Sequence, residues 1–268
     1  MEIYGLYLCL GIIAGLISGL FGLSGGVVIV PILIFTFAAQ GFSPDVLTHL
    51  AIGTSLATIV VTSISSIFAH HKRGAVLWSV VIWLTPGIMI GAALGATFAV
   101  SIGGPVLQLC FGAFLCVVAI TMMLSLRPDG AHSIPGVVGK SIMGAVIGFV
   151  SSIFGIGGGS LSVSGLSWFK VPMKNAVATS AACGLPVAIS GTSTYLFQGW
   201  QVTDLPTGAL GFIYFPAFIG IVCASAFSAK WGAKLAHQLP ANVLRIGFAI
   251  LLLVIGARFI CRNFGALF

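Results

Sequence analysis

The chain has 268 residues, of which 59% are hydrophobic and only 6% are charged, whereas a typical soluble domain has roughly 25% charged residues. This composition excludes a water-soluble domain and indicates one polytopic membrane domain that covers residues 1–268. The net charge of +7 does not indicate a nucleic-acid partner, because the eleven Lys and Arg residues lie in separate short loops beside apolar segments.

Glycines interrupt the first long apolar stretch of the chain. The hydrophobic pattern predicts one helix at residues 4–22 and a second at 27–39, with the break Leu23-Ser24-Gly25-Gly26 between them. The second helix is too short to span a bilayer comfortably. Three more membrane helices complete the first half of the chain, at residues 46–69, 76–100 and 106–126.

The second half of the chain repeats this order after a hydrophilic link. The link is 127–140, and the predicted segments after it are a helix at 141–155, a break at 156–159, and helices at 160–169, 175–197, 205–229 and 241–260. The two breaks align without a gap, so that Phe21-Gly22 matches Phe154-Gly155. We therefore interpret residues 4–126 and 141–262 as two repeats, each a glycine-broken helical hairpin followed by three transmembrane helices. The predicted fold class is an all-α polytopic membrane protein.

The charges in equivalent loops predict the orientation of the two repeats. In three pairs of equivalent loops, one loop is basic and its counterpart is acidic or uncharged; the basic loops are 70–74, 170–174 and 230–237. Because basic loops face the cytoplasm, the halves should have opposite orientations, with the link 127–140 on the cytoplasmic side. This arrangement is an inverted repeat. It requires each glycine-broken segment to enter the bilayer and return to the same side as a helical hairpin. Arg258 and Arg262, near the C-terminus, are the exception to the pattern.

The glycine breaks are the predicted substrate site. A helix that is broken inside the bilayer leaves its first N–H groups without acceptors, and these groups carry partial positive charge. Glycine lets an anion approach them closely, and two inverted copies would bring two such helix ends together near the midplane. Hydroxyls on the following helices would complete the site. The predicted substrate-binding residues are Ser24, Gly25, Gly26, Val27, Thr54, Ser55, Gly157, Gly158, Gly159, Ser160, Thr179 and Ser180.

These motifs resemble the sulfite exporter TauE/SafE family, whose sequences carry a glycine-rich F-G-x-G-G-G break in each of two repeats. Phe21–Gly26 and Phe154–Gly159 match that break, although Ser24 stands where the second copy has Gly157. Thr54-Ser55 and Thr179-Ser180 match the Thr-Ser pair of the family. The resemblance implies an exporter of sulfite, sulfonates or related sulfur-containing anions in the inner membrane of a bacterium.

Simpler interpretations of the same residues are also open. GxxxG-like spacing favours close helix packing, and we expect that role for isolated glycines such as Gly91, Gly95 and Gly148. Single Thr and Ser hydroxyls often bond back to the preceding helical turn.

Other classes of function are open as well. An anion channel is one alternative, and a thiol-dependent membrane enzyme that uses Cys183 is a weaker one, because no nucleophile has a base placed beside it. The six cysteines form no metal-ligand pattern, so we expect neither a metal nor a cofactor. The expected partners are a small anionic substrate and the lipid bilayer, with a homodimer as an open alternative and sodium as an open coupling ion.

Overall fold

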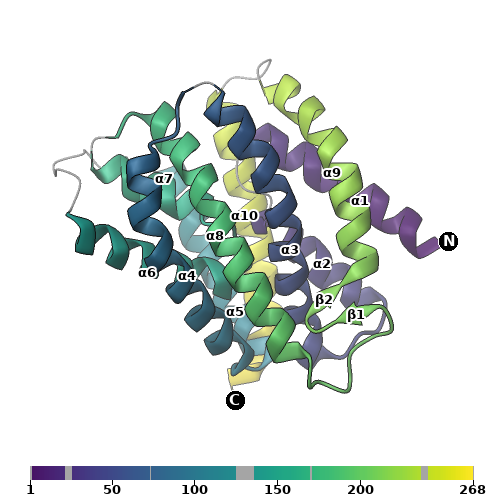
Figure 1. The fold of residues 1–268 in the computed structure, drawn as a ribbon. Coiled ribbons are helices and arrows are strands. Elements are labelled where there is room, and N and C mark those ends of the chain that lie inside the picture. Colours follow the sequence, from purple (N-terminus) through teal and green to yellow (C-terminus); the bar gives the residue numbers. More distant parts are fainter. Residues whose placement is uncertain are drawn as a thin grey trace.

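The computed structural model describes residues 2–21, 26–72, 74–124, 136–169, 171–236 and 241–267. Within these residues the chain is a bundle of helices with one short β-hairpin (Figure 1). Five of the described helices are long and apolar enough to cross a membrane. The elements are α1 (Glu2–Phe21), α2 (Gly26–Ala39), α3 (Pro44–His71), α4 (Trp78–Val100), α5 (Gly104–Met123), α6 (Val137–Ile153), α7 (Gly159–Trp168), α8 (Met173–Gly199), β1 (Ala209–Leu210), β2 (Ile213–Tyr214), α9 (Phe215–Ala236), α10 (Ala241–Asn263) and the 3-10 helix η1 (Phe264–Leu267).

The second glycine break lies where the sequence predicts it, whereas the first falls on residues 22–25, outside the described residues. Helix α1 ends at Phe21 and α2 begins at Gly26, while α6 ends at Ile153 and α7 begins at Gly159. The predicted site residues Ser24 and Gly25 lie in the first break, outside the described residues. Most of the predicted link between the halves lies outside them as well.

One predicted helix is wrong over its first ten residues. The sequence predicts a single helix at 205–229, whereas β1 and β2 form an antiparallel hairpin there and α9 begins only at Phe215. Gly208 and Gly211 have φ values of +94° and +54°, and only glycine adopts such values without strain. A Cβ at Gly211 would also overlap the carbonyl oxygen of Leu196 on α8. The hairpin therefore packs tightly against the end of α8, which no local pattern indicates.

The two halves of the chain interdigitate. Helix α1 packs along α9 at one side of the bundle and α4 packs along α6 at the other, with the pairs α3–α8 and α5–α10 between them (Figure 1). Each of these four pairs joins a helix of the first half to a helix of the second. The hydrophobic core is therefore shared by the halves.

The packing contacts give the direction of each helix pair. Positions 53, 56 and 63 of α3 meet positions 195, 191 and 184 of α8, so these two helices are antiparallel. Helices α5 and α10 are antiparallel as well, because Gly112 meets Gly256 while Gln108 meets Asn263. In the outer pairs, α1–α9 and α4–α6, the contacting positions rise together, and those helices run parallel.

Glycines on α4 allow the close approach of α6. A Cβ at Gly87, Gly91 or Gly95 would overlap a backbone carbonyl oxygen of α6, at Ser141, Ala145 and Phe149 respectively. The packing role expected of Gly91 and Gly95 is confirmed, and a Cβ at Gly148 would likewise overlap the carbonyl oxygen of Ile88. Such four-residue spacing of small residues is typical of membrane helix pairs.

A buried polar chain connects α3, α5 and α10. The Gln108 side-chain amide donates to the hydroxyl of Thr48 at 2.7 Å, and Asn263 donates to the side-chain oxygen of Gln108 at 3.0 Å. His49 on α3 is 4% exposed, and its Nε2 lies 3.0 Å from the carbonyl oxygen of Ala99 at the end of α4. These contacts satisfy polar groups that would be costly to leave unpaired inside a membrane protein.

Candidate functional site

The second break is a buried turn built on two glycines in left-handed conformation. Gly155 and Gly158 have φ values of +67° and +69°, and residues 155–158 are all buried. The amide of Ile156 donates to the carbonyl oxygen of Ser151 at 2.9 Å, and the amide of Ser162 donates to that of Gly158 at 2.8 Å. The first bond lies at the C-terminal end of α6, and the second forms the first turn of α7. The glycines are thus required by the backbone conformation itself.

Backbone donors are left unused between these two bonds. Among the described residues, no acceptor faces the amides of Gly157, Gly158 and Gly159, which lead into the first turn of α7. Such amides carry the partial positive charge of a helix N-terminus. Of the side chains that the structure describes, no Asp, Glu, Lys or Arg is buried. The buried donors at this break are therefore neutral groups.

The start of α2 lies against this turn. A Cβ at Gly26 would overlap the carbonyl oxygen of Gly155 and would lie 3.0 Å from the Cα of Ile156. Conversely, a Cβ at Gly155 would lie 2.8 Å from Cγ2 of Val30 on α2. Two predicted site segments that are more than a hundred residues apart in the sequence are thus in contact. Val27 is 4% exposed and begins the apolar surface that α2 presents inside the bundle.

The two predicted serines on α3 and α8 both bond to the second break. The hydroxyl of Ser55 donates to the carbonyl oxygen of Gly155 at 3.0 Å, and the hydroxyl of Ser180 donates to that of Gly159 at 2.8 Å. Each serine thereby holds one end of the turn in place. Their hydroxyl hydrogens are engaged by the backbone, so these residues fix the geometry of the site.

The two predicted threonines make equivalent contacts in the two halves. Thr54 on α3 accepts a hydrogen bond of 2.9 Å from the amide of Tyr214, directly before α9. Thr179 on α8 accepts one of 3.0 Å from the amide of Leu77, directly before α4. Each threonine therefore fixes the beginning of a helix from the other half of the chain.

Two further serines at the break were not among the predicted site residues. Ser151 and Ser162 are both 0% exposed, and within the described part of the chain neither hydroxyl has a hydrogen-bond partner. The Oγ of Ser151 lies 3.4 Å from the position that a Cβ on Gly158 would take. The gapless alignment of the two breaks also pairs Ser18 with Ser151, and this match is a sequence signal for Ser151. Nothing in the local sequence distinguishes Ser162 from its neighbours Ser160 and Ser164. Ser164 is exposed, and the side chain of the predicted site residue Ser160, the second residue of α7, lies outside the described part of the structure.

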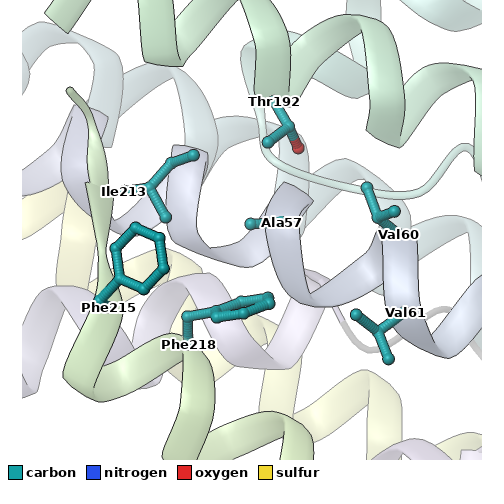
Figure 2. A pocket seen from close by; sticks show the side chains of 7 residues that line it. All are labelled: Ala57, Val60, Val61, Thr192, Ile213, Phe215 and Phe218. Carbon is teal, nitrogen blue, oxygen red and sulfur yellow. The ribbon is translucent and has the colours of Figure 1, made fainter. Parts of the chain in front are cut away.

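A groove lies between α3 and α9, on another side of the α3–α8 pair. It has a volume of about 240 Å³ and is lined by Ala57, Val60, Val61, Thr192, Ile213, Phe215 and Phe218. Figure 2 shows the rings of Phe215 and Phe218 extending from α9 toward α3. The hydroxyl of Thr192 is buried and has no partner among the described residues.

We call the line of contact between α3 and α9 the α3–α9 seam and the equivalent line between α4 and α8 the α4–α8 seam. The α4–α8 seam is closed by a hydrogen bond. The hydroxyl of Ser190 on α8 donates to the carbonyl oxygen of Met89 on α4 at 2.7 Å. Counting from Thr179 and Thr54, the position equivalent to Ser190 is Ser65 on α3, which is exposed. The two seams therefore have equivalent threonine contacts at one end, but further along Ser190 bonds across one seam while its counterpart Ser65 is exposed.

Comparison with known proteins identifies similar chains along nearly the whole length. The family model described as sulfite exporter TauE/SafE matches residues 7–259. A "probable membrane transporter protein" of Haemophilus influenzae is 36% identical over 251 residues, which cover 93% of this chain and 95% of that protein. Proteins with the same description from Methanocaldococcus jannaschii and Bacillus subtilis are each 31% identical, and the matches cover 94% of this chain with 93% and 95% of those proteins. No solved structure matches this chain.

Proposed function

This chain belongs to the sulfite exporter TauE/SafE family, and we propose that it is a secondary transporter that moves a small sulfur-containing anion across the inner membrane of a bacterium. The family and the descriptions of the relatives point to a membrane transporter rather than an enzyme. We propose the class of substrate, the transport mechanism, the location in the inner membrane and the residues that bind the anion.

The observation that carries the proposal is the set of unused amides at the second break. Gly157, Gly158 and Gly159 are buried or half-buried, and their N–H groups lie at the N-terminus of α7. The dipole of a helix is equivalent to roughly half a positive charge at this end. Oxyanions bind well to such amides. A site of neutral donors also suits transport, because a buried cation would hold a divalent anion more firmly against release.

The proposed fold of the transporter is an inverted repeat. The antiparallel pairs α3–α8 and α5–α10 join equivalent helices of the two halves, which is the relation that opposite orientation in the membrane requires. The equivalent contacts of Thr54 with Tyr214 and of Thr179 with Leu77 support it further.

The proposed mechanism is alternating access at the two seams. In the structure the α4–α8 seam is joined by Ser190 and Met89, whereas the α3–α9 seam contains the groove of Figure 2. If one seam closes while the other opens, with the threonine contacts as pivots, the transporter would change from a state open to one side of the membrane to a state open to the other side.

Paired cysteines would test this mechanism. In a variant without native cysteines, a disulfide between Met89→Cys and Ser190→Cys should form readily and stop transport until it is reduced. The matched pair lies at the equivalent positions of the α3–α9 seam, which are Ser65 and, counted from Tyr214 as Met89 is from Leu77, Ala226. Ser65→Cys and Ala226→Cys should cross-link only in the state in which the α3–α9 seam is closed, and more in the presence of substrate. Transport that continues with either seam cross-linked would contradict alternating access.

The experiment that tests the function is flux into proteoliposomes. Purified protein should take up labelled sulfite, thiosulfate or a small sulfonate, with an initial rate that saturates as the concentration rises. Sulfate and small carboxylates serve as competing anions, and protein-free liposomes are the control. A rate that rises linearly with concentration would favour the channel alternative, and absence of flux for every sulfur-containing anion would overturn the proposal.

A further inference from the structure

Ser151 and Ser162 share with Thr192 a buried hydroxyl that has no hydrogen-bond partner among the described residues, and these two serines flank the second break. Hydroxyls inside membrane helices usually donate to a carbonyl oxygen one turn earlier, and Thr62, Thr85 and Thr97 do so at 3.2, 2.8 and 2.9 Å. Ser151 and Ser162 make no such bond within the described residues, although both are completely buried. A buried hydroxyl without a partner is unfavourable. A ligand that accepts from both would remove that cost.

Both serines adjoin the same glycine. The Oγ of Ser151 lies 3.4 Å from the Cβ position of Gly158, which also faces Cγ2 of Val187 at 3.4 Å. Ser162 follows Gly158 by one helical turn, as the bond from its amide to the Gly158 carbonyl oxygen shows. Side chains on a helix lean toward its N-terminus, and for Ser162 this direction leads back to the break. The missing side chain of Gly158 thus leaves a gap beside Ser151 in which a Cβ would make ordinary van der Waals contacts.

The first repeat has no hydroxyl residue at the position equivalent to Ser162. In the gapless alignment of the two breaks, Ser162 corresponds to Ile29 and Ser160 corresponds to Val27. Ile29 and Val27 are 5% and 4% exposed and belong to the apolar core. Ser55 and Ser180 both bond to the second break as well. Polar groups from both halves of the chain therefore meet at the second break.

We propose that the anion binds to the second break alone, where the hydroxyls of Ser151 and Ser162 donate to it together with the amides of Gly157, Gly158 and Gly159, and that α2 serves only as an apolar wall. This inference rests on the proposed function. It differs from the site predicted from the sequence, in which the helix ends at both glycine breaks bind the anion equally. The ligand is a small oxyanion with at least two oxygens that accept hydrogen bonds, since the hydroxyls and amides come from two helices.

Two alanine variants test the assignment through affinity and stability together. In the full-length protein, Ser151→Ala and Ser162→Ala should each weaken binding and raise the KM for the transported anion by about 10- to 100-fold, as expected for a lost hydrogen bond to a charged group. The melting temperature without ligand should stay the same or rise, because no hydrogen bond within the protein is removed. The stabilisation that sulfite or thiosulfate gives to the wild type should shrink in both variants.

Three matched serines serve as controls. Ser164→Ala changes an exposed residue of the same helix, Ser152→Ala changes a buried neighbour whose hydroxyl donates to the Phe149 carbonyl oxygen at 3.2 Å, and Ser18→Ala changes the counterpart of Ser151 in the first repeat. None of these should change the affinity for the anion by more than about 2-fold.

Each contrary outcome has a distinct meaning. If the wild type transports the anion and Ser151→Ala and Ser162→Ala bind it normally, this inference fails while the proposed function stands. If Ser18→Ala weakens binding as much as Ser151→Ala does, the site is shared and the inference also fails. Loss of sodium dependence with unchanged anion affinity would assign the hydroxyls to a cation and overturn it. If the wild type binds and transports no sulfur-containing oxyanion, the proposed function itself fails.

Discussion

Substitution of Gly158 separates the function of the second break from its folding. The φ value of +69° makes any side chain with a Cβ unfavourable there, at a cost of roughly 1–2 kcal/mol for alanine. The surrounding space adds little to this cost, because the nearest atoms to a new Cβ are 3.4, 3.4 and 3.5 Å away, which is ordinary van der Waals contact. Asparagine tolerates the left-handed region better than alanine does, so Gly158→Asn should lose less stability than its size suggests.

The effect on transport should be larger than the effect on stability. A Cβ at Gly158 would stand beside the Oγ of Ser151 and the unused amides, in the space that we assign to the anion. We expect both Gly158→Ala and Gly158→Asn to lower the flux of the sulfur-containing anion by more than about 10-fold, which corresponds to about 1.4 kcal/mol or more of binding. The larger asparagine side chain should lower it further.

Two other glycines complete the comparison. At Gly155, a Cβ would meet the same left-handed strain and would also lie 2.8 Å from Cγ2 of Val30 and 3.2 Å from the Cα of Ile52, so Gly155→Ala should lose roughly 1–3 kcal/mol more through overpacking. Gly165 lies within α7 without positive φ, and a Cβ there would be 3.5 Å from the sulfur of Met143, so Gly165→Ala should preserve both stability and flux.

The assay is initial flux in proteoliposomes together with thermal unfolding in detergent for each variant. The reasoning is refuted if Gly158→Ala and Gly158→Asn transport at the wild-type rate. It is also refuted if their flux falls only in proportion to the amount of folded protein, as we expect for Gly155→Ala.

Three further predictions concern packing, the buried polar chain and the thiol. Gly91→Ala should lower the thermal stability by roughly 1–3 kcal/mol, because its Cβ would overlap the carbonyl oxygen of Ala145 on α6; an unchanged melting temperature would contradict the packing role. Gln108→Leu should cost roughly 1–3 kcal/mol in the same assay, because Asn263 loses its buried acceptor; a melting temperature equal to that of the wild type would contradict this. Cys183→Ala should leave flux unchanged, because this buried cysteine packs within the core as a small apolar residue; lost flux with normal folding would revive the thiol-enzyme alternative.

Hydrophobic runs and glycines predict most of the secondary structure because these signals are local. A long apolar run must form a helix in a bilayer to pair its backbone groups, and consecutive glycines such as Gly157-Gly158-Gly159 mark where the run is interrupted. The region 205–229 was predicted wrongly because its hairpin depends on a distant contact, in which Gly211 packs against the carbonyl oxygen of Leu196. The amino-acid composition alone did not distinguish that hairpin from the start of a helix.

The candidate site was predicted only in part for the same reason. The sequence by itself determined that the chain is a membrane protein, and it predicts two similar halves with two glycine breaks, because length, hydropathy and repetition can all be read along the chain without knowledge of distant contacts. Only the tertiary structure decided which hydroxyls are available to a ligand. Thr54 and Ser55 bond to segments 160 and 100 residues away, whereas Ser151 and Ser162 have no partner among the described residues. Hydrogen-bond partners depend on which helices pack together and in which direction, and that information lies in contacts between distant segments.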